Sequence, residues 1–389
     1  MTEHLPVSEI SRPVAVLDRA GLARAVALAA MAADRKSAIP ILSNLRLRGY
    51  GGALEVIGTD CDLEISVMVE GPADARLDLT VPAHMLKDIL TKAKDSALAS
   101  LDDASNDDVF RCGVDLGGVK FKLNAIPATD FPVLDPVSYG HSFQVDADTV
   151  NDLLGKTSFA ISTEETRYYL NGIHLHSLDR LGVFRAVSTD GHRLAMMEIP
   201  APEGSLGMPG VILPRRAVGL LIDAIKLLGK GKETLPMVRV EIASDRARFT
   251  IGSFTLTSKL VDGSFPDYER VVPRSGDMAN IDVKEAKDAI SQISLISGNP
   301  KGQTVKFSFA RDRLVLSCRD DDNGTSEAVV PCGSAATLEI GFAARYLIDI
   351  LAEISAGHVF MSLTDSGSPA VFTDPCDPRF KAVLMPKRF

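Results

Sequence analysis

The sequence predicts an α+β fold built from three tandem copies of one domain. Six segments carry apolar residues at the i, i+3, i+4, i+7 spacing of amphipathic helices. Between them lie short runs of alternating apolar and polar residues, separated by Gly, Asp and Asn, as antiparallel strands joined by tight turns require. Short sequence patterns also recur about every 130 residues, which indicates an internal repeat. We therefore expect each copy to contain two helices and an antiparallel sheet.

The six helical segments form three pairs along the chain. A helix with one apolar stripe must bury it, and the neighbouring strands offer the surface, so both helices of a copy are expected on one face of its sheet. The helical segments are 22–29, 86–93, 150–157, 221–228, 286–293 and 347–354. The clearest strand-like runs are 54–57, 246–256, 304–309 and 313–317.

The repeat rests on three patterns shared by the first two copies. A proline opens a helix at positions 82 and 214, a spacing of 132 residues. A Thr-Asp pair precedes a returning strand at 59–60 and at 189–190, a spacing of 130 residues, and Phe-Pro recurs at 131–132 and 265–266, a spacing of 134 residues. The third copy is more divergent, with Arg319-Asp320 at the turn and Gly341-Phe342-Ala343 before its second helix.

The domains are expected at 14–135, 141–271 and 278–389, with linkers in the stretches that contain Pro, Ser or Gly between them. Residues 1–13 carry acids and two prolines and lack the apolar core of a signal peptide, so they are expected to be a loose N-terminal extension. No apolar run approaches the roughly 20 residues that cross a bilayer. We expect a cytoplasmic protein.

Composition limits the function further. The chain is 46% hydrophobic and 24% charged, with a net charge of −9, which argues against a generally basic nucleic-acid binder but not against a local basic surface. Its five cysteines are scattered without a CxxC pair, so neither a disulfide framework nor a zinc site is predicted. No metal or cofactor is expected.

The polar turn within 187–195 is the main candidate for chemistry. Asp190 and His192 lie on it, with Gly191 free to take a positive φ. A metal-dependent hydrolase could use Asp60, Asp190 and His192. Because an acid recurs at both equivalent turns, a turn-forming role is the simpler interpretation. The sequence Gly191 to Leu194 is expected to have no counterpart after Asp60.

Three other motifs are better explained by structure than by ligands. The GKT at 155–157 lacks the first glycine of a phosphate loop and falls inside a predicted helix. His174 and His176 would share one strand face but have no further ligand at metal spacing. The run from Asp320 to Gly324 does not fit calcium-loop spacing and is typical of a hairpin turn.

Basic residues lie on or beside all six predicted helices, and several avoid the apolar stripe. Acidic neighbours such as Asp88 and Asp223 are compatible with an ordinary solvated face. With the helices of each copy on one side, even a small basic excess would be concentrated there. Such a surface suits loose, sequence-independent contact with phosphates.

Four motifs resemble those of the bacterial sliding clamp family, the beta subunits of DNA polymerase III. They are 166–172 (TRYYLNG), 188–195 (STDGHRLA), 258–268 (SKLVDGSFPDY) and 385–389 (MPKRF), and the resemblance runs from about Val14 to the last residue. It implies the DNA clamp fold, a head-to-tail homodimer closed into a ring around duplex DNA, and a protein that tethers the replicative polymerase without a catalytic site of its own. It also implies the polymerase catalytic subunit, the clamp loader and other proteins with a clamp-binding motif as partners.

The resemblance further implies two sets of functional residues. The pocket for a partner peptide would comprise Leu170, Thr189, Gly191, His192, Arg193, Leu194, Pro266, Arg270, Val271, Tyr346, Val383, Leu384, Met385, Pro386 and Arg388. The residues facing DNA would include Arg24, Lys36, Lys87, Tyr169, Arg215 and Arg216. The chain departs from the family pattern at Gly302, Ala343, Lys387 and Phe389, and these departures bear on its peptide preference.

Overall fold

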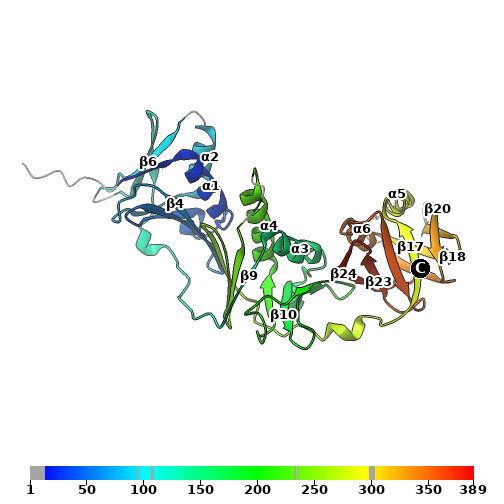
Figure 1. The fold of residues 1–389 in the computed structure, drawn as a ribbon. Helices are drawn as coiled ribbons and strands as arrows, with labels where there is room; N and C mark the ends of the chain where they lie inside the picture. Colours follow the sequence, from blue (N-terminus) through cyan, green and yellow to red (C-terminus); the bar gives the residue numbers. More distant parts are fainter. Residues whose placement is uncertain (1–13, 94–95, 107–108, 232–233, 235, 298–302) are drawn as a thin grey trace, which may run out of the picture. The chain divides into compact units, whose positions relative to one another are not determined.

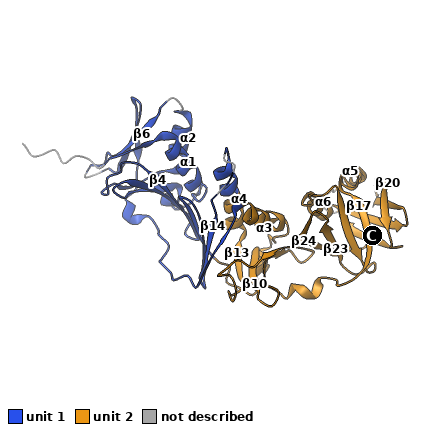
Figure 2. Cartoon of the chain, in the orientation of Figure 1, with its two compact units in different colours: residues 1–147, 223–259 blue, residues 148–222, 260–389 orange. Residues whose placement is uncertain are grey.

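A computed structural model describes residues 14–93, 96–106, 109–231, 234, 236–297 and 303–389 (Figure 1). The predicted extension 1–13 and Gly302 lie outside this part. The chain divides into two compact units (Figure 2). Unit 1 comprises Met1–Ala147 and Asp223–Lys259, and unit 2 comprises Asp148–Ile222 and Leu260–Phe389.

One order of elements occurs three times along the chain: a strand, a helix, four strands, a helix and three strands. The first copy contains β1 (Val14–Asp18), α1 (Arg19–Ala29), β2 (Asn44–Gly49), β3 (Ala53–Thr59), β4 (Leu63–Glu70), β5 (Asp78–Pro82), α2 (Ala83–Lys92), β6 (Leu98–Asp103), β7 (Arg111–Leu116) and β8 (Val119–Asn124). The predicted threefold repeat is therefore confirmed.

The second and third copies follow the same order. The second contains β9 (His141–Val145), α3 (Ala147–Ser158), β10 (Gly172–Leu178), β11 (Val183–Thr189), β12 (Arg193–Pro200), β13 (Val211–Pro214), α4 (Arg215–Gly229), β14 (Val238–Ile242), β15 (Arg246–Ile251) and β16 (Phe254–Lys259). The third contains β17 (Asp277–Asp282), α5 (Val283–Ile293), β18 (Thr304–Ala310), β19 (Arg313–Asp320), β20 (Gly324–Ser334), β21 (Glu339–Ala343), α6 (Ala344–Ala352), β22 (His358–Leu363), β23 (Ala370–Asp374) and β24 (Asp377–Leu384).

The antiparallel sheets continue from one copy into the next. In unit 1, the strand order is β5-β2-β3-β4-β16-β15-β14-β9, and β4 pairs with β16 so that Val67 lies opposite Phe254. A separate sheet has the order β1-β6-β7-β8. In unit 2, β12 pairs with β24 in the order β13-β10-β11-β12-β24-β23-β22-β17-β20-β19-β18-β21. Both junctions follow one rule: the third strand after the first helix of a copy (β4 or β12) pairs with the last strand of the following copy (β16 or β24).

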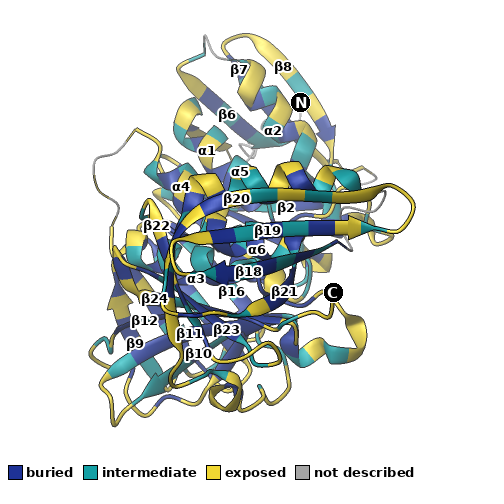
Figure 3. Ribbon diagram, turned by 90° about the vertical axis from the view of Figure 1, so that its right-hand side faces the viewer, coloured by how far each residue is buried: buried dark blue, intermediate teal, exposed yellow. Residues whose placement is uncertain are grey.

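Strand alternation and helix stripes build the cores. Along β19, residues from Leu314 to Cys318 alternate between buried and partly exposed positions, as expected for a sheet with one covered face (Figure 3). Helix α5 packs against β20 and α6. Phe307, Phe342 and Phe372 are buried between these layers and contact one another edge to face.

Capping aspartates or prolines mark the starts of four helices. The Asp18 carboxylate accepts a hydrogen bond from the backbone of Gly21 at the start of α1, and Asp282 caps α5 in the same way. Pro82 and Pro214 directly precede α2 and α4, confirming the repeated helix opening. No helix in the described part of the chain is both long and apolar enough to span a membrane.

The GKT motif lies inside α3, as predicted, and its lysine has a structural role. Lys156 Nζ lies 2.9 Å from Asp377 Oδ2 and 3.2 Å from Ser355 Oγ, with both charged side chains largely buried. Burial raises the pKa of Asp377, but hydrogen bonds from Arg379 and Lys156 outweigh this and lower it to about 2. This ion pair connects α3 of the second copy to β24 of the third.

Candidate partner-binding site

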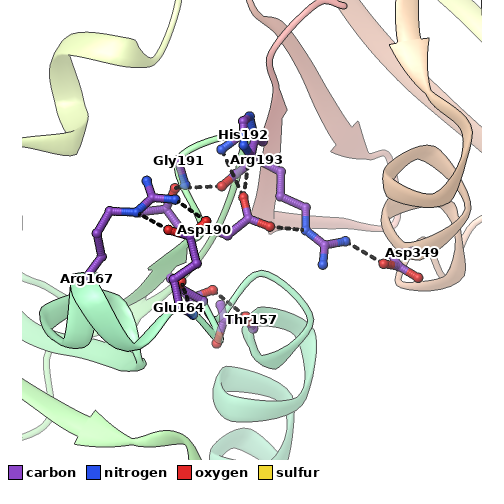
Figure 4. Close-up of polar contacts among 11 residues, drawn as sticks. Thr157, Glu164, Arg167, Asp190, Gly191, His192, Arg193 and Asp349 are labelled. Atoms are coloured by element: carbon purple, nitrogen blue, oxygen red, sulfur yellow. Dashed lines mark hydrogen bonds and ion pairs between the residues drawn. The ribbon is translucent and has the colours of Figure 1, made fainter. Parts of the chain in front are cut away.

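The turn between β11 and β12 is held by two side chains at its start. Asp190 Oδ1 accepts hydrogen bonds from the backbone N–H groups of His192 (2.9 Å) and Arg193 (3.0 Å) (Figure 4). Thr189 Oγ1 accepts one from Gly191 N–H and donates one to the Arg193 carbonyl. Asp190 therefore shapes an Asx-type turn, as the repeat predicts.

The first copy contains the same turn between β3 and β4. Asp60 Oδ1 accepts from the N–H groups of Asp62 (2.9 Å) and Leu63 (2.8 Å), and Thr59 Oγ1 accepts from Cys61 N–H and donates to the Leu63 carbonyl. Cys61 has φ of 77°, close to the 88° of the equivalent Gly191. The prediction that Gly191 to Leu194 has no counterpart after Asp60 is thus wrong for the backbone.

The third copy also has a capping acid at its turn. Asp320 Oδ1 accepts from the N–H groups of Asp322 (3.2 Å) and Asn323 (3.1 Å) between β19 and β20, confirming the predicted hairpin turn. What distinguishes the second copy is its side chains. A Cβ atom at Gly191 would lie 2.5 Å from Nη1 of Arg167, so a larger residue there would displace the end of that side chain.

Arg193 connects this turn to the third copy. Its side chain is 6% exposed and forms ion pairs with Asp190 (3.1 Å) and with Asp349 of α6 (2.5 Å) (Figure 4). The guanidinium also lies over the rings of Tyr346 (4.4 Å) and Phe159 (5.2 Å). These four partners belong to unit 2, so Arg193 fixes the turn relative to α6.

An apolar cavity of about 270 Å³ opens beside the turn. Leu194 of β12 and Val383 of β24 form its floor. They belong to a buried apolar cluster that also contains side chains of β11 and β23 and Tyr268 of the 3₁₀ helix Tyr268–Val271. Its lining comprises Arg167, Tyr169, Leu170, Thr189, Gly191, His192, Arg193, Leu194, Pro266, Asp267, Tyr268, Val271, Val383 and Met385. An apolar floor with a few polar groups at the rim can hold and orient an extended apolar segment.

The structure brings most of the expected pocket residues together. Ten of the fifteen line the cavity: Leu170, Thr189, Gly191, His192, Arg193, Leu194, Pro266, Val271, Val383 and Met385. Leu384 does not, because strand alternation turns it from its neighbour Val383 into the core of the third copy, where it is fully buried. The structure therefore does not bring Leu384 to the cavity.

Four more expected residues lie outside the cavity lining: Arg270, Tyr346, Pro386 and Arg388. Arg270 is largely exposed and paired with Asp267, so it lies at the rim. Tyr346 lines an adjoining polar hollow of about 260 Å³ and stacks against the ring of His192. That hollow shares His192 and Arg193 with the apolar cavity.

Four lining residues were not assigned to the pocket from sequence: Arg167, Tyr169, Asp267 and Tyr268. All four lie within the motifs 166–172 and 258–268, so their place in these motifs could have indicated a pocket role. For Tyr169 the resemblance implies a contact with DNA instead. Here it is half-buried at the cavity and in edge contact with Tyr168.

The other residues expected to face DNA lie on or next to helices. Arg24 is exposed on α1, Lys36 is exposed in the loop after it, and Lys87 is half-buried on α2. Arg215 and Arg216 are the exposed first two residues of α4. These positions are compatible with contact to a polyanion in each unit.

The two histidines of β10 share one face, as predicted. His174 and His176 stack with ring centroids 4.4 Å apart. Within the described residues, no group of three or more His, Cys, Asp or Glu side chains could hold a metal ion.

The threefold repeat, the sheets that continue between copies and the apolar cavity define a modular binding protein. Family models for the N-terminal, central and C-terminal domains of the DNA polymerase III beta subunit match residues 15–135, 144–267 and 269–388. The beta sliding clamp of Caulobacter vibrioides is 38% identical over 376 residues, covering 96% of this chain and 99% of the relative. That of Escherichia coli is 33% identical over 356 residues, covering 90% and 93%.

Solved structures agree. The Bartonella birtlesii sliding clamp bound to griselimycin is 36% identical with a TM-score of 0.90, covering 97% of this chain and 100% of that chain. The Pseudomonas aeruginosa clamp bound to griselimycin is 30% identical with a TM-score of 0.89, covering 97% and 100%. The chain belongs to the DNA polymerase III beta subunit family, the beta sliding clamps. This membership supports a processivity factor of DNA replication and not a metal-dependent hydrolase using Asp60, Asp190 and His192.

Proposed function

We propose that two copies of the chain close head to tail into a ring that encircles duplex DNA and tethers the replicative polymerase. The observation that carries this is the unfinished sheet pattern. Copies one and two join through β4 and β16, and copies two and three join through β12 and β24. The equivalent strands left over are β20 of the third copy and β8 of the first.

Both remaining strands have an open side within the described residues. β8 is the last strand of its sheet. From Gly324 to Pro331, β20 pairs with β19 on one side only, and from Cys332 to Ser334 it also pairs with β17. Val119 on β8 and Val329 on β20 are about 60% exposed. An open strand edge with exposed apolar residues favours pairing with another chain.

The repeat implies that β20 of one chain pairs antiparallel with β8 of another, so two different strands meet at the contact. β8 carries Lys120 and Lys122, and β20 carries Glu327, so the charges are complementary. A head-to-tail contact of this kind gives a closed ring when the rotation per chain closes, and two chains of three domains make a ring of six. We place the domains at 14–135, 141–271 and 278–389.

We expect the protein in solution to have twice the 41.6 kDa mass of a single chain. Val329→Asp should yield the single-chain mass, because it places a charge at the strand edge that pairs. Multi-angle light scattering after gel filtration measures this directly. Leu206→Asp alters an equally exposed leucine in the loop before β13 and should leave the dimer intact. A wild-type protein with the mass of one chain at micromolar concentration would contradict the ring.

The DNA contacts proposed are Arg24, Lys36, Lys87, Tyr169, Arg215 and Arg216. The position of Arg215 and Arg216 supports this. Positive side chains in the first turn of a helix oppose its dipole, so folding does not favour them there. A phosphate near that helix end would be stabilised both by the guanidinium groups and by the helix dipole. Such contacts read no bases and allow sliding.

The apolar cavity is the proposed docking site for the polymerase catalytic subunit, the clamp loader and other partners with a short apolar motif. Its proposed residues are those lining it together with Arg270, Tyr346, Pro386 and Arg388 at its margin. The function is topological, with no reacting group of its own, carried out in the cytoplasm where bacterial DNA lies. Griselimycin is bound in the two solved clamps above, and we propose that it occupies this cavity in the present chain and can serve as its probe.

Val271→Asp should weaken griselimycin binding at least tenfold, measured by isothermal titration calorimetry. Val271 lines the cavity but is 46% exposed, so the new carboxylate costs little stability while it opposes an apolar ligand. Leu181→Asp is the matched control, because Leu181 is an exposed apolar residue of the same unit outside the cavity lining. Equal loss of affinity in both variants would show that the ligand binds elsewhere.

A further inference from the structure

One wall of the apolar cavity is a segment without regular strand structure, Phe265–Val271. Pro266, Asp267, Tyr268 and Val271 line the cavity from this side. Because strands of one sheet build the floor, the sheet fixes the floor but not this wall. Something has to hold the segment at a defined distance from β12 and β24.

Two histidines of β10 lie directly behind the segment. His174 stacks on Phe265 with ring centroids 4.8 Å apart and planes 6° from parallel, and on His176 at 4.4 Å. His176 Nε2 lies 2.9 Å from the Tyr268 hydroxyl. Phe265 and Tyr268 meet edge to face, so four rings form one continuous group.

Arg185 of β11 completes the contact. Its Nη1 donates to the Tyr268 hydroxyl (2.6 Å) and to Glu269 Oε1 (2.8 Å), and its guanidinium also pairs with Glu198. Since the Tyr268 oxygen accepts from Arg185, its hydrogen is available to His176. Side chains of β10 and β11 thus hold the wall at two of its rings, Phe265 and Tyr268.

This arrangement is costly for the fold by itself. The Nδ1 atoms of His174 and His176 are buried and form no hydrogen bond of good geometry among the described residues, and the carbonyl of His174 is only a weak partner for His176. Burial, together with the neighbouring imidazole and the charge of Arg185, lowers the pKa of His176 to about 3. Apolar side chains would fill the same space without unpaired nitrogens. The polar pair is therefore better explained by what it positions than by core packing.

We propose that His174 and His176 are positioning residues that hold the wall Phe265–Val271 and thereby set the width of the cavity for its apolar ligand. This rests on the proposed function of the cavity as a docking site. The imidazoles do not line the cavity and so do not touch the ligand. They act through Phe265 and Tyr268.

The test compares His176→Leu, which fills the space without a hydrogen bond, with His176→Gln, which retains a polar side chain that can reach Tyr268. We expect His176→Leu to weaken griselimycin binding about fivefold while its Tm stays within a few degrees of the wild type. His176→Gln should bind within twofold of the wild type. Tyr268→Phe should lose affinity by a similar factor, and the double variant His176→Leu/Tyr268→Phe should lose no more than either single variant.

Hydrogen exchange gives a second measurement of the wall. The Val272 N–H donates to the Glu269 carbonyl and closes the 3₁₀ turn of the wall, so its exchange should accelerate in His176→Leu and not in His176→Gln. Wild-type affinity and wild-type exchange in His176→Leu would overturn the proposal, as would a loss of affinity that only follows a loss of Tm. If wild-type protein does not bind griselimycin, the docking function fails, and this inference fails with it. Binding by the wild type with equal binding by His176→Leu removes the positioning role alone.

Discussion

Replacing Arg193 by alanine is expected to lower the free energy of unfolding of unit 2 by about 3 kcal/mol, because it leaves two carboxylates without their shared cation. Asp190 is 15% exposed and Asp349 is 33% exposed, and both accept from the same guanidinium. The substitution also removes the side chain that lies over Tyr346 and Phe159. We therefore expect griselimycin binding to weaken together with stability, since Arg193 lines the cavity.

Urea unfolding followed by circular dichroism measures the first effect. Arg167→Ala is the control for stability, because Arg167 pairs with a half-exposed Glu164 on the surface and should cost less than about 1 kcal/mol. Asp349→Asn in the Arg193→Ala background should recover part of the loss by removing one uncompensated charge. Equal stability of Arg193→Ala and Arg167→Ala would mean that the buried ion pairs do not hold the turn to α6.

Acidification below about pH 6.5 is expected to destabilise unit 2 through His174 and His176. Burial lowers the pKa of His174 to about 4, and that of His176 to about 3, from 6.5 in an exposed chain. The folded protein keeps both rings neutral, while the unfolded chain takes up protons below 6.5. The stabilisation is therefore complete above pH 6.5 and falls by about 1.4 kcal/mol per pH unit for each histidine down to about pH 4.

Denaturant midpoints measured from pH 7.5 to 5.0 test this effect. The double variant His174→Leu/His176→Leu should show a much smaller slope than the wild type. Asp377 does not contribute to this slope, because its lowered pKa means that its stabilising effect is lost only between about pH 3.8 and 2. His84 of unit 1 also has a lowered pKa from burial and the charges of Arg35 and Lys87, so a residual slope is expected in the double variant. An unchanged slope in the double variant would contradict the effect.

The repeat and its elements could be predicted from sequence because they depend on local patterns. The spacing of Leu86 and Leu90 fixes an apolar helix stripe, and Asp60 and Asp190 recur where a turn needs a capping carboxylate. Local patterns fail where the position of a side chain depends on how distant segments pack. Leu384 lies next to pocket residues in sequence, yet the alternation of β24 turns it into the core.

The wall behind the cavity could not be predicted for the same reason. Sequence reasoning placed His174 and His176 on one strand face and treated them as ordinary positions. Nothing local indicates that, about 90 residues later, Phe265 stacks on His174 and Tyr268 meets His176 edge to face. Likewise Cys61 gives no sign that it takes the positive φ of a glycine, because the backbone of its turn is imposed by Thr59 and Asp60.

DNA topology tests most directly whether the chain holds DNA by encircling it. The protein is loaded onto nicked circular DNA by its clamp loader, separated from free protein by gel filtration, and the DNA is then cut once. We expect the protein to stay with the circle for the duration of the column and to leave after the cut by sliding off the ends. Equal retention on circular and linear DNA would contradict encirclement and indicate direct binding instead.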